Sequence, residues 1–295
     1  MRTYSRLRRS LRIGPLLALA LGLAACGGDT VSLDPVASAA SRTAQVSTQH
    51  MSMTAVMQLP GVSQTISFTA EGAVDNRARR GEIAIDMSSL AGALPPSAHA
   101  LSDPGLWRGK EVFDASNGLV VYMNFPFLAQ SARLTKPWIR FDVGSFAKKL
   151  GFDFDQLMQM SGGDPTRQLE YLRATSGEVR KLGTAKVRGV TTTHYRAHVD
   201  LSKYPKLLPE SQRGVARSSV EALTKLTGAS TFPVEVWVDN RNLVRRMRMV
   251  MVMKAPQGPM TMWMTLDFYG FGTPVNVELP PADQVTDLAE LAASG

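Results

Sequence analysis

Cysteine is almost absent from this chain, because Cys26 is the only one in 295 residues. A disulfide framework is therefore excluded, and so is a metal site built from several thiolates. The sequence also has no Walker A, G-x-S-x-G, H-E-x-x-H or G-x-G-x-x-G pattern, and its Asp and Glu residues show no obvious acid–base pair. We therefore expect no enzymatic activity, no metal and no cofactor.

Two short patterns could still suggest a catalytic or metal site. Ser145 and Lys148 match S-x-x-K, but the S-D-N and K-T-G elements that accompany it in penicillin-binding enzymes are missing. His194 and His198 would share one face of a helix, but they stand in an alternating stretch that predicts a strand, where they lie about 13 Å apart. We interpret the S-x-x-K match as a chance pattern and the two histidines as surface residues.

No apolar run is long enough to span a bilayer. The longest stretch near the N-terminus, Ile13–Ala25, has 13 residues and follows five Arg residues with no acidic residue among them. At about 1.5 Å per residue it would span roughly 20 Å, which suits a cleaved signal peptide better than a membrane helix. The signal ends in Leu23-Ala24-Ala25-Cys26, which resembles the lipobox of bacterial lipoproteins. We therefore expect a signal peptide over residues 1–25 and lipid attachment at Cys26; the alternative is an ordinary secretory signal.

An excess of positive charge is largely confined to that signal. The whole chain has 33 Lys and Arg against 25 Asp and Glu; without the five signal arginines, 28 remain against 25. A nearly balanced, exported domain gives no reason to expect nucleic-acid binding.

Residues 26–42 are small and polar and show no periodicity, which predicts a flexible tether between the acylated cysteine and a single domain over residues 43–290. Alternation of apolar and polar residues, the period of half-buried antiparallel strands, dominates that domain. Expected strands cover residues 51–58, 65–70, 83–87, 112–113, 119–125, 136–141, 178–182, 190–201, 232–238, 243–254, 260–269 and 275–279. Helices are expected over residues 146–160, 164–175, 209–226 and from 281 onward. About ten strands with a few helices indicate one α+β domain.

Methionine is concentrated in the last two long strands. Seven of the 15 Met residues alternate along residues 247–253 and 260–264, on one face of each strand. Their flexible, polarisable side chains can adapt to irregular apolar shapes such as acyl chains, although methionine is also an ordinary core residue. Arg246, Arg248 and Asp267 fall on the opposite face, where we expect them to be solvated.

Several short motifs carry a resemblance over residues 43–285. They are Lys136-Pro137-Trp138, Gly189 with Thr193 and Tyr195, Pro233-Val234-Glu235-Val236-Trp237-Val238-Asp239, Phe271-Gly272 with Pro274-Val275, and Pro280-Pro281. Together with the lipobox, they make the chain similar to the LppX/LprG group of envelope lipoproteins. The resemblance implies the LolA/LolB-like fold, a strongly curved antiparallel β half-barrel with helices packed on its concave face. It also implies no catalytic residues.

In such a fold the alternating apolar positions would line a lipid-binding cavity. The expected lining residues are Ile66, Phe68, Ile83, Ile85, Met87, Met247, Met249, Met251, Met253, Met262, Met264, Leu266 and Phe268. The resemblance thus predicts a protein anchored at the extracytoplasmic face of the cell membrane that carries or presents an acylated lipid or glycolipid. An envelope transporter or sensor protein is a further expected partner. The alternative is a regulatory module of the same fold that senses an envelope component or docks a membrane protein without transport.

Overall fold

The structure, a computed structural model, describes residues 34–61, 65–94, 96–142, 172–208, 210–255 and 258–288. The chain divides into two compact units, residues 1–32 and residues 33–295, and every described residue belongs to the second. Cys26, Ser145, Lys148 and the helix expected over residues 146–160 lie outside the described residues, as does most of the helix expected over 164–175. Within the described part, no helix is long and apolar enough to cross a membrane.

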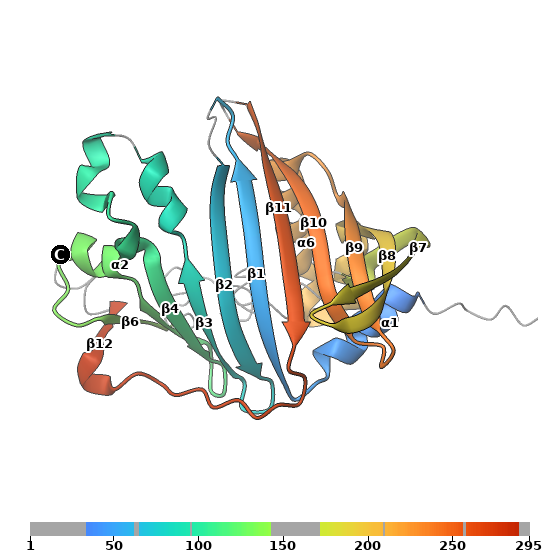
Figure 1. Cartoon of the computed structure of the whole chain (residues 1–295), viewed down its shortest axis with the longest axis horizontal. Helices are drawn as coiled ribbons and strands as arrows, with labels where there is room; N and C mark the ends of the chain where they lie inside the picture. The colour runs from blue at the N-terminus through green and yellow to red at the C-terminus, as the bar shows by residue number, and fades with distance from the viewer. Residues whose placement is uncertain are drawn as a thin grey trace, which may run out of the picture. The chain divides into compact units, whose positions relative to one another are not determined.

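The described residues form one twelve-stranded sheet, which is curved and open (Figure 1). Its strands are β1 (Thr48–Gln58), β2 (Thr65–Asp75), β3 (Arg80–Asp86), β4 (Arg108–Asp114), β5 (Val120–Asn124), β6 (Trp138–Asp142), β7 (Thr175–Val187), β8 (Val190–Asp200), β9 (Thr231–Asp239), β10 (Val244–Ala255), β11 (Gly258–Tyr269) and β12 (Val285–Asp287). The order is β12-β6-β5-β4-β3-β2-β1-β11-β10-β9-β8-β7. Two meanders, β1–β6 and β7–β11, are therefore joined in the middle of the sheet by the antiparallel pair β1–β11.

Residues with positive φ form two of the tight turns between these strands. The Asn117-Gly118 turn joins β4 to β5, and Gly118 adopts a positive φ of 93°. Arg188 and Gly189, at φ values of 46° and 80°, make the tight turn between β7 and β8. Two successive residues with positive φ give the turn a twist that matches the twist of the flanking strands.

The C-terminal segment departs from the expected arrangement. Residues 275–279 form no strand, and the segment from 281, where a helix is expected, begins with the short 3-10 turn η6 (Ala282–Gln284) followed by β12. Leu288 is helical, and the rest of the expected helix lies outside the described residues. β12 pairs in parallel with β6, so the predicted purely antiparallel sheet is wrong at this edge. The Lys136 ammonium donates to the Val285 carbonyl at 2.9 Å, and Arg140 donates to Asp287 at 2.6 Å. These long-range bonds hold the short strand in place.

Among the described residues, the α-helices are α1 (Pro35–Ala44), α2 (Pro126–Ser131) and α6 (Glu210–Thr227), and besides η6 there are 3-10 turns η1 (Ser88–Ala93), η2 (Pro96–Leu101), η3 (Pro104–Trp107), η4 (Leu172–Ala174) and η5 (Leu201–Leu207). The connection between β3 and β4, where neither a strand nor a helix is expected, is a run of 3-10 turns. Thr175, the last residue of the helix expected over residues 164–175, is instead the first residue of β7.

The α1 helix corrects the prediction of a flexible tether through residue 42. The carboxylate of Asp34 accepts from the backbone N–H of Val36 at 2.9 Å, and Pro35 occupies the first turn, where its missing N–H costs nothing. Val36, Ala39 and Ala40 are buried, at the spacing of one helical face. The small side chains of this stretch are typical of a linker, but its buried residues have the spacing of one helical face.

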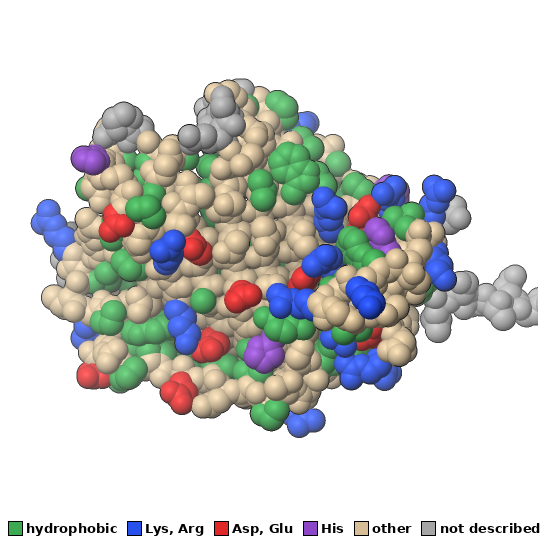
Figure 2. All heavy atoms as spheres, viewed as in Figure 1, with side chains coloured by type: hydrophobic (Ala, Val, Ile, Leu, Met, Phe, Trp, Pro, Cys, Tyr) green, Lys and Arg blue, Asp and Glu red, His purple; other side chains and the backbone are tan. Residues whose placement is uncertain are grey.

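The main core lies between α1 and one face of the sheet. Val36, Ala39 and Ala40 of the helix cluster with Met51, Met247 and Leu266 of the sheet, and Val220 and Leu223 of α6 pack against the same cluster. We call this face of the sheet the inner face and the opposite one the outer face. The outer face is turned to the viewer in Figures 1 and 2, and α6 lies behind the sheet.

Two glycines on the inner face bring aromatic rings close to the backbone. A Cβ built on Gly81 would overlap the Phe113 ring, and one on Gly109 would overlap the Phe125 ring. Both rings therefore rest on sheet backbone that bears no side chain. This packing fixes the inner face of β3–β5.

Candidate ligand-binding face

The strand registers align most of the expected lining residues on the inner face. Met57 lies opposite Ile66 on β2 and opposite Met262 on β11. Met262 in turn lies opposite Met251 on β10. Directly opposed residues of antiparallel strands point to the same face, so this face is continuous from β10 to β2. Ile85 extends it to β3 because it lies opposite Ala70.

Twelve of the thirteen expected residues share this face, and Met87 lies just beyond the end of β3. The buried members are Ile66, Ile83, Met247, Met249, Met264, Leu266 and Phe268. The half-buried members are Phe68, Ile85, Met87, Met251, Met253 and Met262. The face that should bind an acyl chain is therefore partly protein core.

On β10 and β11, the buried and the half-buried lining residues lie toward different ends of the strands. Met247, Leu266 and Phe268 belong to the core cluster that includes α1. The half-buried Met251, Met253 and Met262 lie toward the β10–β11 hairpin, at the upper end of the strands in Figure 1. Apolar side chains that the protein itself does not fully cover can take up apolar area from a ligand.

Glu111 is a residue of this face that the sequence reasoning missed. It lies opposite Ile83 on β3 and opposite Met123 on β5, so its carboxyl stands among apolar side chains of the inner face. It is half-buried, and burial raises the pKa of Glu111. Its spacing of two residues from Phe113 was the available signal, but the expected strand began only at Val112.

Gln49 is a second polar residue on this face. It is fully buried, opposite Val74 on β2, and neither its amide oxygen nor its amide nitrogen has a hydrogen-bond partner among the described residues. Leaving such a group unpaired costs free energy. The inner face thus contains polar atoms that the described residues do not satisfy.

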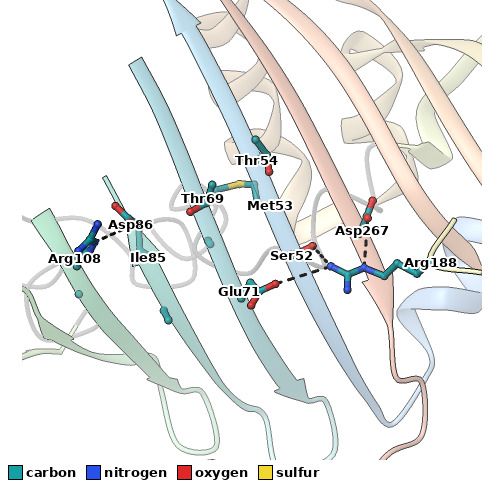
Figure 3. A pocket seen from close by; sticks show the side chains of 13 residues that line it. Ser52, Met53, Thr54, Thr69, Glu71, Ile85, Asp86, Arg108, Arg188 and Asp267 are labelled. Carbon is teal, nitrogen blue, oxygen red and sulfur yellow. Dashed lines mark hydrogen bonds and ion pairs between the residues drawn. The ribbon is translucent and has the colours of Figure 1, made fainter. Parts of the chain in front are cut away.

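The outer face is polar and carries a hollow of about 610 Å³ (Figure 3). The side chain of Arg188 reaches it from the β7–β8 turn and donates to the Ser52 hydroxyl at 2.8 Å. The guanidinium also lies 3.5 Å from the Asp267 carboxylate and 4.0 Å from the Tyr269 ring centroid. Charged and hydroxyl-bearing residues make up most of its lining, together with Met53, Ala70, Ala84 and Ile85. The charged groups suit an acyl chain poorly.

Asp267 corrects an expectation about the outer face. It was expected to be solvated, but it is only 7% exposed and accepts two hydrogen bonds from Arg246. Figure 2 shows acidic and basic side chains interspersed over this face of the sheet. Arg188, from a turn distant in sequence, accounts for part of the burial of Asp267.

His194 and His198 lie on β8, as expected. The His194 ring stacks on Trp237 with centroids 4.0 Å apart, and its Nε2 lies 3.3 Å from the Glu235 carboxylate. A hydrogen bond from Arg196 is the main cause that holds the pKa of Glu235 below its ordinary value. His194 therefore belongs to a stacked, ion-paired cluster on the sheet surface.

Comparison with known proteins gives a partial relative in sequence and several in structure. No family model matches the chain. An uncharacterized 31.2 kDa protein of Streptomyces griseus is 30% identical over 164 residues, which cover 54% of this chain and 51% of that protein. The chain thus spans about half the length of this curated relative.

Among solved structures, the lipoprotein LppX of Mycobacterium tuberculosis matches 83% of this chain and 100% of its own, with a TM-score of 0.43 and 11% identity. LprF of Mycobacterium bovis matches 84% of this chain and 96% of its own, with a TM-score of 0.39 and 13% identity. A LolA superfamily protein of Nitrosomonas europaea covers 84% and 94%, with a TM-score of 0.28 and 8% identity. The chain is similar to LppX, LprF and a LolA superfamily protein.

Proposed function

We propose that this protein is a lipid-anchored lipoprotein of the extracytoplasmic membrane face that binds an acylated lipid or glycolipid on the inner face of its sheet. Cys26, preceded by Leu-Ala-Ala at the end of an apolar signal, would carry the anchor. The observation that supports ligand binding most directly is the aligned set of half-buried apolar side chains. Met251 and Met262, directly opposed on β10 and β11, belong to this set.

Thioether side chains suit this task because they are flexible and polarisable. The five strands β10, β11, β1, β2 and β3 are neighbours in the sheet, so the face extends about 19 Å across them at about 4.8 Å per strand. Burying an acyl chain gains about 0.8 kcal/mol per CH₂, or roughly 12 kcal/mol for sixteen carbons before any cost of ordering. Such a ligand would not leave readily into water, so release would need a membrane or a protein acceptor.

The first test analyses what the protein holds. The mature chain, residues 26–295 with Cys26→Ser, would be expressed in a Streptomyces host, and its organic extract analysed by mass spectrometry. Recovery of one lipid class near one molecule per protein supports binding. An empty protein that also fails to take up fluorescent fatty-acid or glycolipid probes would contradict it and favour the regulatory or docking alternative.

A second test locates the ligand. The double variant Met251→Gln and Met262→Gln keeps side-chain size but makes the proposed contact polar, and it should lose most of the bound lipid. Val252→Gln is the matched control, because Val252 is exposed on the outer face of the same strand. Equal lipid retention in both variants would place the ligand elsewhere.

A further inference from the structure

Glu111 is the one charged side chain at the inner-face positions of seven neighbouring strands. From β11 through β1 to β6 the registers are unbroken, so each inner-face position is fixed by its opposed partner. Apart from Glu111 and the amide of Gln49, these positions hold apolar residues or glycine. A carboxyl at such a place needs a physical reason, because removing a charge from water costs free energy.

Every other acidic residue of β3 and β4 has a basic partner on the neighbouring strand. Lys110 lies 2.8 Å from Glu82, Arg108 lies 2.9 Å from Asp86, and Arg80 lies 2.9 Å from Asp114. These three pairs use all the basic residues of the two strands. Glu111 has no basic partner on either strand. No hydrogen bond or ion pair joins its carboxyl to another described residue.

Its immediate neighbours cannot satisfy the carboxyl. Ile83 and Met123 flank it across the sheet, and Gly109 and Phe113 flank it along the strand. None of these side chains can donate a hydrogen bond. The raised pKa of Glu111 agrees with this placement, since burial without a compensating partner disfavours the charged form.

We propose that Glu111 binds the head group of the ligand and selects amphiphiles whose head group donates hydrogen bonds, above all an amine. This inference rests on the proposed function, because it assigns the polar end of the same site. Glu111 on β4 lies three strands from Met53 on β1, about 14 Å across the face. Ile85 of β3 and Ala70 of β2, directly opposed to each other, lie between them, so the positions between the head group and the methionines are apolar.

An anionic head group would be disfavoured at the same position. Two carboxylates placed together in an apolar environment repel each other, whereas an ammonium group supplies the missing donor and charge. The site would therefore rank ligands of equal chain length in the order amine, alcohol, carboxylate. This order is the property to measure.

The test uses the mature chain with Cys26→Ser and a neutral apolar probe, N-phenyl-1-naphthylamine, displaced by dodecylamine, dodecanol or dodecanoate at pH 7. We expect dodecylamine to displace the probe at a concentration at least fivefold below dodecanoate. Glu111→Gln should reduce this preference to less than twofold, and Glu111→Met should do the same if the Gln variant is unstable. Glu82→Gln, on the outer face of β3, should keep the preference.

Two results would overturn the inference. If the probe binds and Glu111→Gln displays the unchanged preference, the head group lies elsewhere, and the proposed function stands. If the protein binds neither the probe nor any of the three amphiphiles, the inference and the proposed function both fail.

Discussion

Asp267 accepts two hydrogen bonds from Arg246, from Nε at 2.6 Å and from Nη2 at 2.7 Å, while only 7% of Asp267 is exposed. This bidentate pair joins β10 to β11 on the outer face, directly behind the methionines of the inner face. The same bond is the main cause that raises the pKa of Arg246. The outer face therefore contributes to holding together the two strands that carry the proposed ligand contacts.

Asp267→Asn should destabilise the protein by about 2 kcal/mol, because hydrogen bonds to a charged group contribute about 1.5–3 kcal/mol and Arg246 would lose its counter-charge. Urea unfolding followed by tryptophan fluorescence measures this change. Glu71→Gln is the control: Glu71 is exposed and lies 4.0 Å from Arg188, so it should cost less than about 0.5 kcal/mol. Equal effects in the two variants would contradict the assignment.

Arg188→Ala should loosen the β7–β8 turn while leaving the fold intact. The side chain fastens this turn to Ser52 of β1 and to the Tyr269 ring of β11. Because the guanidinium is partly exposed, we expect a loss of less than about 1 kcal/mol in global stability. Hydrogen exchange should nevertheless become faster for backbone amides near residues 187–190. Unchanged exchange there would show that the turn is held without Arg188.

Thr43→Val should cost about 2 kcal/mol. The Thr43 hydroxyl is fully buried, donates to the Ala39 carbonyl at 2.7 Å and accepts from the Val244 backbone N–H at 2.8 Å. Valine keeps the shape but leaves that buried N–H without an acceptor. Thr43→Ser keeps the hydroxyl and should retain most of the stability. Thermal unfolding compares the two variants, and a more stable valine variant would contradict the role of the bond.

Gly81→Ala should destabilise the protein by about 1–3 kcal/mol, since the new methyl group would overlap the Phe113 ring and force it to move. Gly92→Ala is the matched control because nothing lies within 4 Å of a Cβ at that position. Both variants can be compared by denaturant midpoint. If Gly81→Ala is as stable as Gly92→Ala, the ring does not rest on the β3 backbone.

Glu111→Gln should make the ligand-free protein more stable at neutral pH and not at low pH. Burial raises the pKa of Glu111 above its ordinary value of 4.5, so the unfolded chain releases this proton first as pH rises. Stability therefore falls through the interval from 4.5 to the raised pKa, and the loss persists above it. Unfolding midpoints of both proteins at pH 7 and well below pH 4.5 measure the difference, and a difference that is the same at both pH values would contradict the prediction.

The long strands could be predicted because each buries one face. Met51–Gln58 and Met260–Tyr269 alternate strictly, and the structure has β1 and β11 there. The same alternation correctly assigned twelve lining residues to one face, since side-chain direction depends only on parity within a strand. Whether those residues bind a ligand stays a prediction.

The remaining features depend on contacts between distant parts of the chain. β12 has three residues and is defined by its partner β6. Parity placed Asp267 on the outer face, but only the structure shows that Arg246 and Arg188 approach it there. α1 was missed because alanine and serine are as common in linkers as in helices that pack closely on a sheet.

The pairing of β1 with β11 determines when the sheet can be completed. Met51 and Phe268 are opposed in this pair although they are nearly at opposite ends of the described chain. Figure 1 shows β1 and β11 side by side in the middle of the sheet. Contacts between residues so far apart in sequence form slowly, because the chain loses the entropy of closing the loop before the new contacts can stabilise it. An emerging chain can build the β1–β5 meander early, but its central ladder must wait for the last long strand. Folding of the whole sheet is thereby delayed until β11 has been synthesised, however early β1 is available.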